Sequence, residues 1–165
     1  MRLPRFASVA VAAMLFMAGQ VLGSTYTFQR GSGVDNDWNS AANWTGGSSS
    51  FPDAAGDVAY SWANNPDTHI ALNQDITVGN VSWYGYQLFI EPGSPAGKLI
   101  VNDGGTPTVW TNTLHYGFQV NCNMQLDSDL TIRHENDVNS GWYGELNGQI
   151  SGAGKLSVAW YGGSG

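Results

Sequence analysis

An internal repeat constrains the fold of this chain more than any other feature. Three segments return in the same order, at offsets of 54, 57 and 59 positions: residues 70–78 as 124–132, residues 97–101 as 154–158, and residues 83–85 as 142–144. The copies carry apolar residues at alternate positions, as half-buried β-strands do. Repeats of a few tens of residues are typical of stacked architectures, in which each unit packs on its neighbours.

Short alternating segments bounded by Gly, Asn, Asp, Ser and Pro occupy most of the chain after residue 23, and helix signals are nearly absent. Many short strands with such turns are compatible with a sandwich, a barrel or a β-solenoid. Drifting offsets favour the solenoid, because stacked coils keep their strand positions while turn lengths vary. We therefore predict an all-β fold with β-solenoid repeats over residues 67–165, in coils of roughly 18 to 27 residues. A β-sandwich is the alternative.

The first 23 residues predict a signal peptide that is cleaved before Ser24. Arg2 and Arg5 precede an apolar stretch at residues 6–18, and small residues lie close to the expected cleavage site. The apolar stretch is shorter than the about 20 residues that a transmembrane helix needs. The sequence thus predicts an exported protein, either secreted or held at the cell surface.

The remaining chain, about one domain long, has four basic and thirteen acidic residues, a net charge near −9. This charge, without any Lys or Arg cluster, argues against nucleic acids and anionic membranes as partners. Cys122 is the single cysteine, so no internal disulfide is available. Since it lies on the apolar side of an alternating segment, we predict a buried, unreactive thiol.

The two ends of the repeat region differ. Residues 24–66 lack the repeat and are rich in Trp, Asn, Gly and Asp, so we predict an N-terminal cap in which Trp38 and Trp44 fill the interior. The sequence stops at Gly165, just after a predicted strand. We expect the repeats to be truncated there, the last coil to fray or aggregate, and any membrane attachment to lie in a region beyond Gly165.

Several segments resemble bacterial autotransporter-associated β-strand repeat proteins. Residues 35–47, with Trp38 and the Ala-Ala-Asn-Trp run that ends at Trp44, resemble the family's opening, together with residues 51–60. Residues 76–83 resemble its next element, and residues 146–156 resemble its L.G.ISG.G.L repeat core. The resemblance implies a right-handed parallel β-helix on an exported, passenger-like protein.

Aromatic residues are the best candidates for a binding site, since the chain has seven Trp and seven Tyr. Trp83-Tyr84 and Trp142-Tyr143 occupy matching repeat positions. Neighbouring residues on a strand face opposite ways, so one member of each pair should be inside and the other outside. Outward rings at equivalent positions would form a ladder on which sugar rings stack. Trp83, Tyr84, Trp142 and Tyr143 are therefore the predicted ligand-binding residues.

Acidic residues also come in close pairs: Asp35 and Asp37, Asp127 and Asp129, Glu135 and Asp137. Such pairs can cleave glycosidic bonds or bind Ca²⁺. Neither an EF-hand spacing nor a calcium-binding repeat accompanies them, and polar strand faces or turns explain them better. The sequence predicts no catalytic residue, metal site or cofactor.

Our main hypothesis is an exported structural or adhesin-like β-solenoid of the cell surface or extracellular matrix, without catalytic activity. The candidate partners are extracellular or surface glycans. The alternative is a carbohydrate-binding module that uses exposed Trp and Tyr. A β-helix polysaccharide-active enzyme is a third hypothesis. It is disfavoured because such a site needs cations to stabilise an acidic substrate. Arg133 is the only Arg beyond the cap, and Lys98 and Lys155 recur at equivalent repeat positions, which indicates a structural role.

Overall fold

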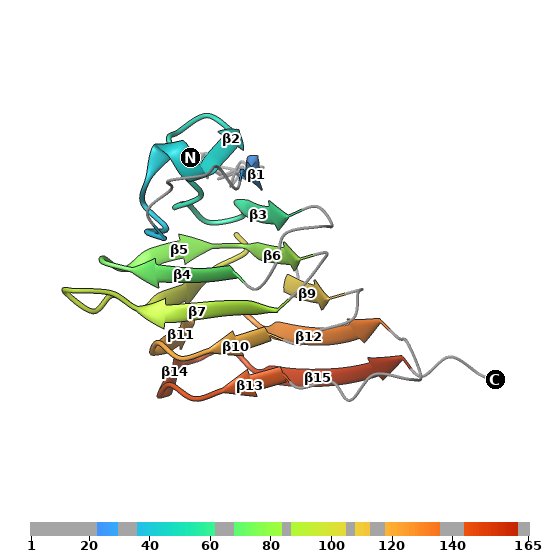
Figure 1. Ribbon diagram of the computed structural model, residues 1–165. Coiled ribbons are helices and arrows are strands. Elements are labelled where there is room, and N and C mark those ends of the chain that lie inside the picture. Colours follow the sequence, from blue (N-terminus) through green and yellow to red (C-terminus); the bar gives the residue numbers. More distant parts are fainter. Residues whose placement is uncertain are drawn as a thin grey trace, which may run out of the picture.

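The chain folds into short strands that stack in three sheets (Figure 1). The computed structural model describes residues 23–29, 36–61, 68–83, 87–104, 108–112, 118–135 and 144–161. Within these ranges every strand pair is parallel except one, and one 3₁₀ turn, η1 (Ala41–Asn43), stands in place of any α-helix. None of the described segments forms a helix that is long and apolar enough to cross a bilayer.

Four layers of three consecutive strands form most of the stack. Layer 1 is β4 (Thr68–Leu72), β5 (Ile76–Val78) and β6 (Asn80–Trp83); layer 2 is β7 (Leu88–Pro92), β8 (Leu99–Val101) and β9 (Thr108–Asn112). Layer 3 is β10 (Phe118–Val120), β11 (Met124–Leu126) and β12 (Leu130–Glu135); layer 4 is β13 (Gly144–Leu146), β14 (Ile150–Gly152) and β15 (Leu156–Tyr161).

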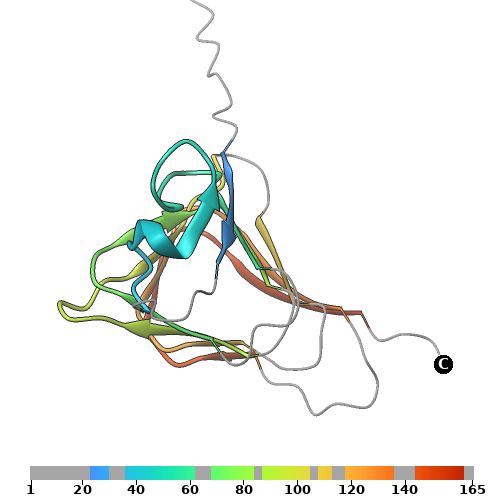
Figure 2. The same cartoon turned by 45° about the horizontal axis from the view of Figure 1, so that its top comes forward.

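Each layer gives one strand to each sheet. The first strands form sheet 2, in the order β13-β10-β7-β4, and the second strands form sheet 3, in the order β14-β11-β8-β5. The third strands lie in sheet 1, which continues through β3 (Val58–Ser61) and β1 (Thr25–Phe28) to β2 (Trp44–Gly46). Seen obliquely from the N-terminal end, the three sheets surround one interior (Figure 2). The alternative β-sandwich would have predominantly antiparallel sheets, unlike these.

The strand register corrects the repeat that the sequence suggested. Paired residues are 20 positions apart for Ile70 and Ile90 and 30 apart for Leu88 and Phe118, so one layer is close to the predicted coil length. The matched segments 70–78 and 124–132 do not lie one above the other. The first runs from sheet 2 into sheet 3, and the second runs from sheet 3 into sheet 1. The two segments are alike because each is a corner in which a three-residue polar turn joins two strands with inward-facing apolar pairs.

The interior is continuous despite that shift. Leu72 and Leu126 come from different sheets, yet both are fully buried in one core cluster. In strands such as β5, alternate residues point inward: Ile76 and Val78 are buried, while Thr77 between them is partly exposed. Because parallel strands place equal positions directly over one another, the inward residues of successive layers pack in columns.

Polar side chains at the corners tie each layer to the next. The Asn73 Oδ1 atom accepts a hydrogen bond from the Ser94 backbone N–H at 2.8 Å. Asp129 Oδ1 accepts from the Lys155 N–H at 2.8 Å, and Asn123 Oδ1 accepts from the Gln149 N–H at 3.0 Å. These bonds satisfy backbone donors at turns, where the strand ladder does not reach them.

Aromatic residues fill the N-terminal end. Trp38 and Trp44, predicted to fill this region, are 1% and 5% exposed, and their ring centroids lie 5.0 Å apart. Trp38 Nε1 donates to the Pro52 carbonyl at 2.9 Å, and Trp44 Nε1 donates to the Trp38 carbonyl at 2.7 Å. Phe28 packs edge-on against Trp44 at 5.3 Å. Both indole N–H groups are thus satisfied inside an apolar cluster, as buried Trp requires.

Candidate functional site

The predicted sugar-stacking residues do not form a surface ladder within the described residues. Trp83 faces the interior, is 3% exposed, and lies 5.4 Å from the Phe28 ring between centroids. Its ring therefore belongs to the core and offers no face to a ligand. Tyr84, Trp142 and Tyr143 lie outside the described residues.

Asp127 and Asp129, the acidic pair at the corner between β11 and β12, accept hydrogen bonds that stabilise the turn. Asp129 accepts the Lys155 backbone N–H, and Asp127 Oδ1 accepts from Gln125 Nε2 at 2.7 Å. Each of these carboxylates therefore has a hydrogen-bond donor of its own. Across the described ranges, no group of three or more His, Cys, Asp or Glu residues is placed to hold a metal ion. Asp35 and Asp137 lie outside those ranges, as does the side chain of Glu135.

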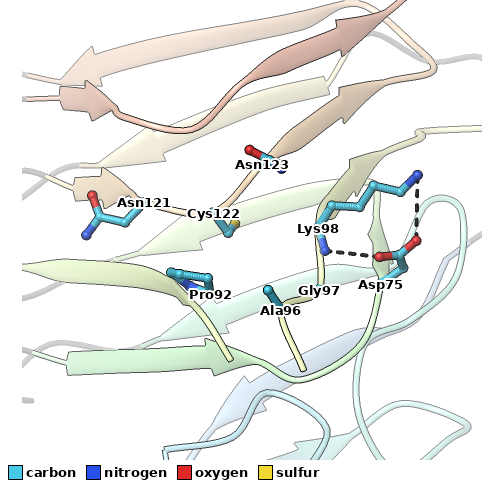
Figure 3. Close-up of a pocket in the computed structure, with 8 residues that line it drawn as sticks. All are labelled: Asp75, Pro92, Ala96, Gly97, Lys98, Asn121, Cys122 and Asn123. Carbon is cyan, nitrogen blue, oxygen red and sulfur yellow. Dashed lines mark hydrogen bonds and ion pairs between the residues drawn. The ribbon is translucent and has the colours of Figure 1, made fainter. Parts of the chain in front are cut away.

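The described surface is hollowed at the corner between sheets 2 and 3. This corner hollow has a volume of about 480 Å³ and is lined by Asp75, Pro92, Ala96, Gly97, Lys98, Asn121, Cys122 and Asn123 (Figure 3). Its residues come from three layers: the β4–β5 turn, the β7–β8 loop and the β10–β11 turn. Clefts of this size take small molecules in many proteins.

Unequal corner lengths create the hollow. Three residues join β10 to β11 and β13 to β14, whereas six, residues 93–98, join β7 to β8. The longer loop projects outward beyond the corners of layers 3 and 4 (Figures 1 and 2). The corner of layer 3 is three residues shorter than the corner of layer 2, and the hollow lies beside the longer loop. Gly97 lets the loop rest on layer 1, because a Cβ at this position would overlap the Gln74 carbonyl oxygen.

A line of alternating polar groups starts at Asp75 and Lys98 in the lining of the hollow and continues beyond it. Lys98 Nζ lies 3.6 Å from Asp75 Oδ2 and donates to Gln125 Oε1 at 2.8 Å. Gln125 Nε2 in turn donates to Asp127. The line therefore crosses layers 1 to 3, and its one ammonium group is balanced by the nearest carboxylate. Half-exposed ion pairs of this kind contribute little to stability.

Cys122 lies behind the hollow and faces the core. The residue is 2% exposed, and burial raises the pKa of its thiol to about 11. A thiol with a raised pKa is almost entirely protonated at neutral pH and is a poor nucleophile. The prediction of a buried cysteine is therefore confirmed, and the raised pKa agrees with the predicted low reactivity.

Sequence reasoning missed the hollow because its lining residues form no binding-site motif, although Asp75, Gly97 and Lys98 belong to the repeated segments. The signal was the unequal spacing between apolar pairs: Leu72 and Ile76 are separated by three residues, and Pro92 and Leu99 by six. That difference becomes meaningful only once the strands are known to stack. The sequence also singled out aromatic residues, whereas the described part of the hollow has none in its lining.

No protein-family model, curated protein or solved structure matches the chain. The resemblance to autotransporter-associated β-strand repeat proteins therefore stays a prediction. The signal segment lies outside the described residues, so export also stays a prediction.

Proposed function

We propose that this protein is an exported, non-catalytic β-solenoid with a structural or adhesin-like role at the cell surface or in the extracellular matrix. The observation that carries the proposal is the stacking of four layers in register, whose strands pair in parallel in all three sheets. In this proposal the sheets are the faces of a right-handed parallel β-helix. Right-handedness is supported by the strong preference of connections between parallel strands of one sheet for that hand.

A scaffold role agrees with where the polar groups are used. Asp75 and Asp129, two of the acids at the corners, accept backbone N–H groups of the next layer at 3.1 and 2.8 Å. Groups engaged in this way hold layers together rather than move protons to a substrate. The excess of acidic residues keeps such a surface hydrated and disfavours binding to anionic polymers.

Cellular export is the experiment that tests this function. The full chain, with a C-terminal epitope tag, is expressed in a bacterial host, and the fractions are analysed by N-terminal sequencing. We expect a product that begins at Ser24 and is found outside the cytoplasm. A product that keeps Met1 and stays in the cytoplasm would contradict export.

The architectural part is tested separately on the purified protein. A solenoid held by interlayer hydrogen bonds should show strong β circular dichroism and slow, cooperative unfolding. An experimental structure in which the chain passes through sheets 2, 3 and 1 in the left-handed sense would contradict the proposed β-helix. Release of reducing or unsaturated ends from polysaccharides would contradict the absence of catalysis.

A further inference from the structure

Asn121 has amide donors that no other side chain of the described residues accepts. Its Oδ1 accepts a hydrogen bond from Asn147 Nδ2 of layer 4 at 2.9 Å. Its Nδ2 lies on the other side, toward layer 2 (Figure 3). Val120 pairs with Ile90 of layer 2 in the strand register. Asn121 and Glu91 are the next residues of these two segments, so Glu91 is the layer 2 residue beneath Asn121. Glu91 Oε1 is instead 2.9 Å from His69 Nδ1. The line of amides therefore stops at Asn121, above the corner hollow.

The hollow offers donors and acceptors without a net charge. Lys98 and Asp75 lie 3.6 Å apart and neutralise each other, and the other polar side chains of the lining are the amides of Asn121 and Asn123. An anionic ligand would meet an ammonium already paired with a carboxylate, on a protein of net charge −7. A cation would meet a carboxylate already paired with an ammonium. Burying an uncompensated charge is costly, so the lining favours a neutral ligand.

The lip of the hollow is apolar. Pro92 and Ala96 are exposed and lie at its edge, opposite the amide of Asn121 (Figure 3). A sugar ring matches this combination, because its C–H face can cover an apolar patch while its hydroxyl groups both donate and accept hydrogen bonds. A purely apolar ligand would leave the amides and the ion pair without solvent or partners.

We propose that the corner hollow binds a neutral saccharide. The ring lies on Pro92 and Ala96, with its hydroxyl groups hydrogen-bonded to Asn121 and to the Asp75–Lys98 pair. The site differs from the aromatic ladder expected at Trp83. The binding role is additional to the scaffold function and does not depend on it, so either can fail alone.

The test is a titration of the isotopically labelled full chain, followed by nuclear magnetic resonance. The probes are four neutral hexasaccharides, of α-1,4-glucose, β-1,4-glucose, mannose and N-acetylglucosamine, with hexagalacturonate as the acidic comparison. We expect at least one neutral probe to shift the side-chain amide signals of Asn121 and Asn123. A dissociation constant on the order of 1 mM is expected for one small open site.

Two variants locate the site, and one is a control. Ala96→Gln adds a side chain at an exposed position and fills the hollow, so binding should weaken about tenfold or more, the equivalent of one or two lost hydrogen bonds. Asn121→Ala removes the amide and should weaken binding by a similar factor. Gln119→Ala changes a nearby residue outside the hollow and should leave the affinity unchanged.

Three results would overturn the proposal. The first is that none of the four neutral probes shifts the two amide signals. The second is that Ala96→Gln binds as tightly as the wild type. The third is tighter binding of hexagalacturonate than of every neutral probe. Failure in any of these ways leaves the export and unfolding tests of the scaffold function intact.

Discussion

Layers 3 and 4 carry the same type of inward-facing residue, but these residues are covered in layer 3 and exposed in layer 4. In layer 3, Met124, Leu130 and Ile132 are at most 7% exposed. Their partners in layer 4 are Ile150, Leu156 and Val158, which are 40%, 38% and 73% exposed. Among the described residues no strand pairs with the outer edges of β13, β14 and β15. At the opposite end, β3 pairs with β6 of layer 1, β1 and β2 follow β3 in the sheet, and Phe28 of the aromatic cluster packs against Trp83 of layer 1.

This difference shows how stability is distributed in the molecule. A residue at an inward position stabilises the fold only when another layer or the N-terminal segment removes it from water, since the gain scales with buried apolar area. Sequence position and residue type are alike in layers 3 and 4, so coverage alone separates them. The following substitutions test this comparison, beginning with the largest effect.

Trp38→Ala should cost the most, because the residue is 1% exposed and supports the covered end. We expect a loss of about 3–5 kcal/mol in the free energy of unfolding, typical of Trp or Phe truncation in a core. Denaturant titration followed by circular dichroism measures it. Trp38→Phe keeps an aromatic ring but loses the Nε1–H bond to Pro52, so it should cost about 1–2 kcal/mol. Equal losses for the two variants would argue against packing as the cause.

Leu130→Ala and Leu156→Ala form a matched pair, since the two leucines are direct neighbours in the β12–β15 register. Leu130 is 0% exposed, and its truncation should cost about 2–5 kcal/mol. Leu156 is 38% exposed, and its truncation should cost about 1 kcal/mol or less. The same titration measures both. Similar costs would mean that layer 4 is covered in solution.

Asp129→Ala should loosen the contact between layers 3 and 4 at this corner, because Asp129 Oδ1 accepts the Lys155 N–H. Losing one such bond should cost about 1 kcal/mol and speed hydrogen exchange at the Lys155 amide. Asp127→Ala is the control, since Asp127 bonds to Gln125 of its own layer. Unchanged exchange at Lys155 in Asp129→Ala would show that this bond does not hold the layer.

The sequence predicted the all-β character and the buried strand positions well where inward residues are large and regular. Leu99 and Val101, and Leu130 and Ile132, were identified as inward pairs, and all four are buried. In β3 the alternation of large apolar residues predicts that Val58 and Tyr60 face inward. This prediction is wrong, because Ala59 and Ser61 are the buried residues.

Volume explains the error in β3. Ala59 pairs with Tyr26, and Ser61 pairs with Trp83, and both aromatic rings are buried. Small residues are needed beside such large ones to keep the interior at normal packing density. Alternation alone cannot reveal this, because the bulky neighbour comes from another strand. The corner hollow escaped prediction for a related reason: it arises from the difference between two corners and not from any residue type.

The smallest expected effect concerns the junction between the covered end and layer 1. Asp53 Oδ1 accepts the Thr77 N–H at 2.8 Å, and Asp57 lies nearby, with its Oδ2 accepting the Asp53 N–H at 3.2 Å. Partial burial, and secondarily the charge of Asp57, raise the pKa of the Asp53 carboxyl above its usual 3.8. The folded state therefore binds this proton more tightly than the unfolded state does. The resulting stabilisation is full below the usual carboxyl pKa and is lost as the pH rises through the folded-state pKa.

Asp53→Asn keeps the acceptor for Thr77 and removes the charge that is unfavourable at neutral pH. We expect this variant to be slightly more stable than the wild type at pH 7, with the difference shrinking as the pH falls toward 4. The gain should be at most a few tenths of a kcal/mol, roughly, because solvent screens a largely exposed carboxyl. Asp127→Asn removes the same charge from layer 3 and controls for net charge. An equal gain in stability with an equal pH dependence in Asp127→Asn would assign the effect to the overall charge of the protein. The Asp53 carboxyl would then make no pH-dependent contribution of its own to stability.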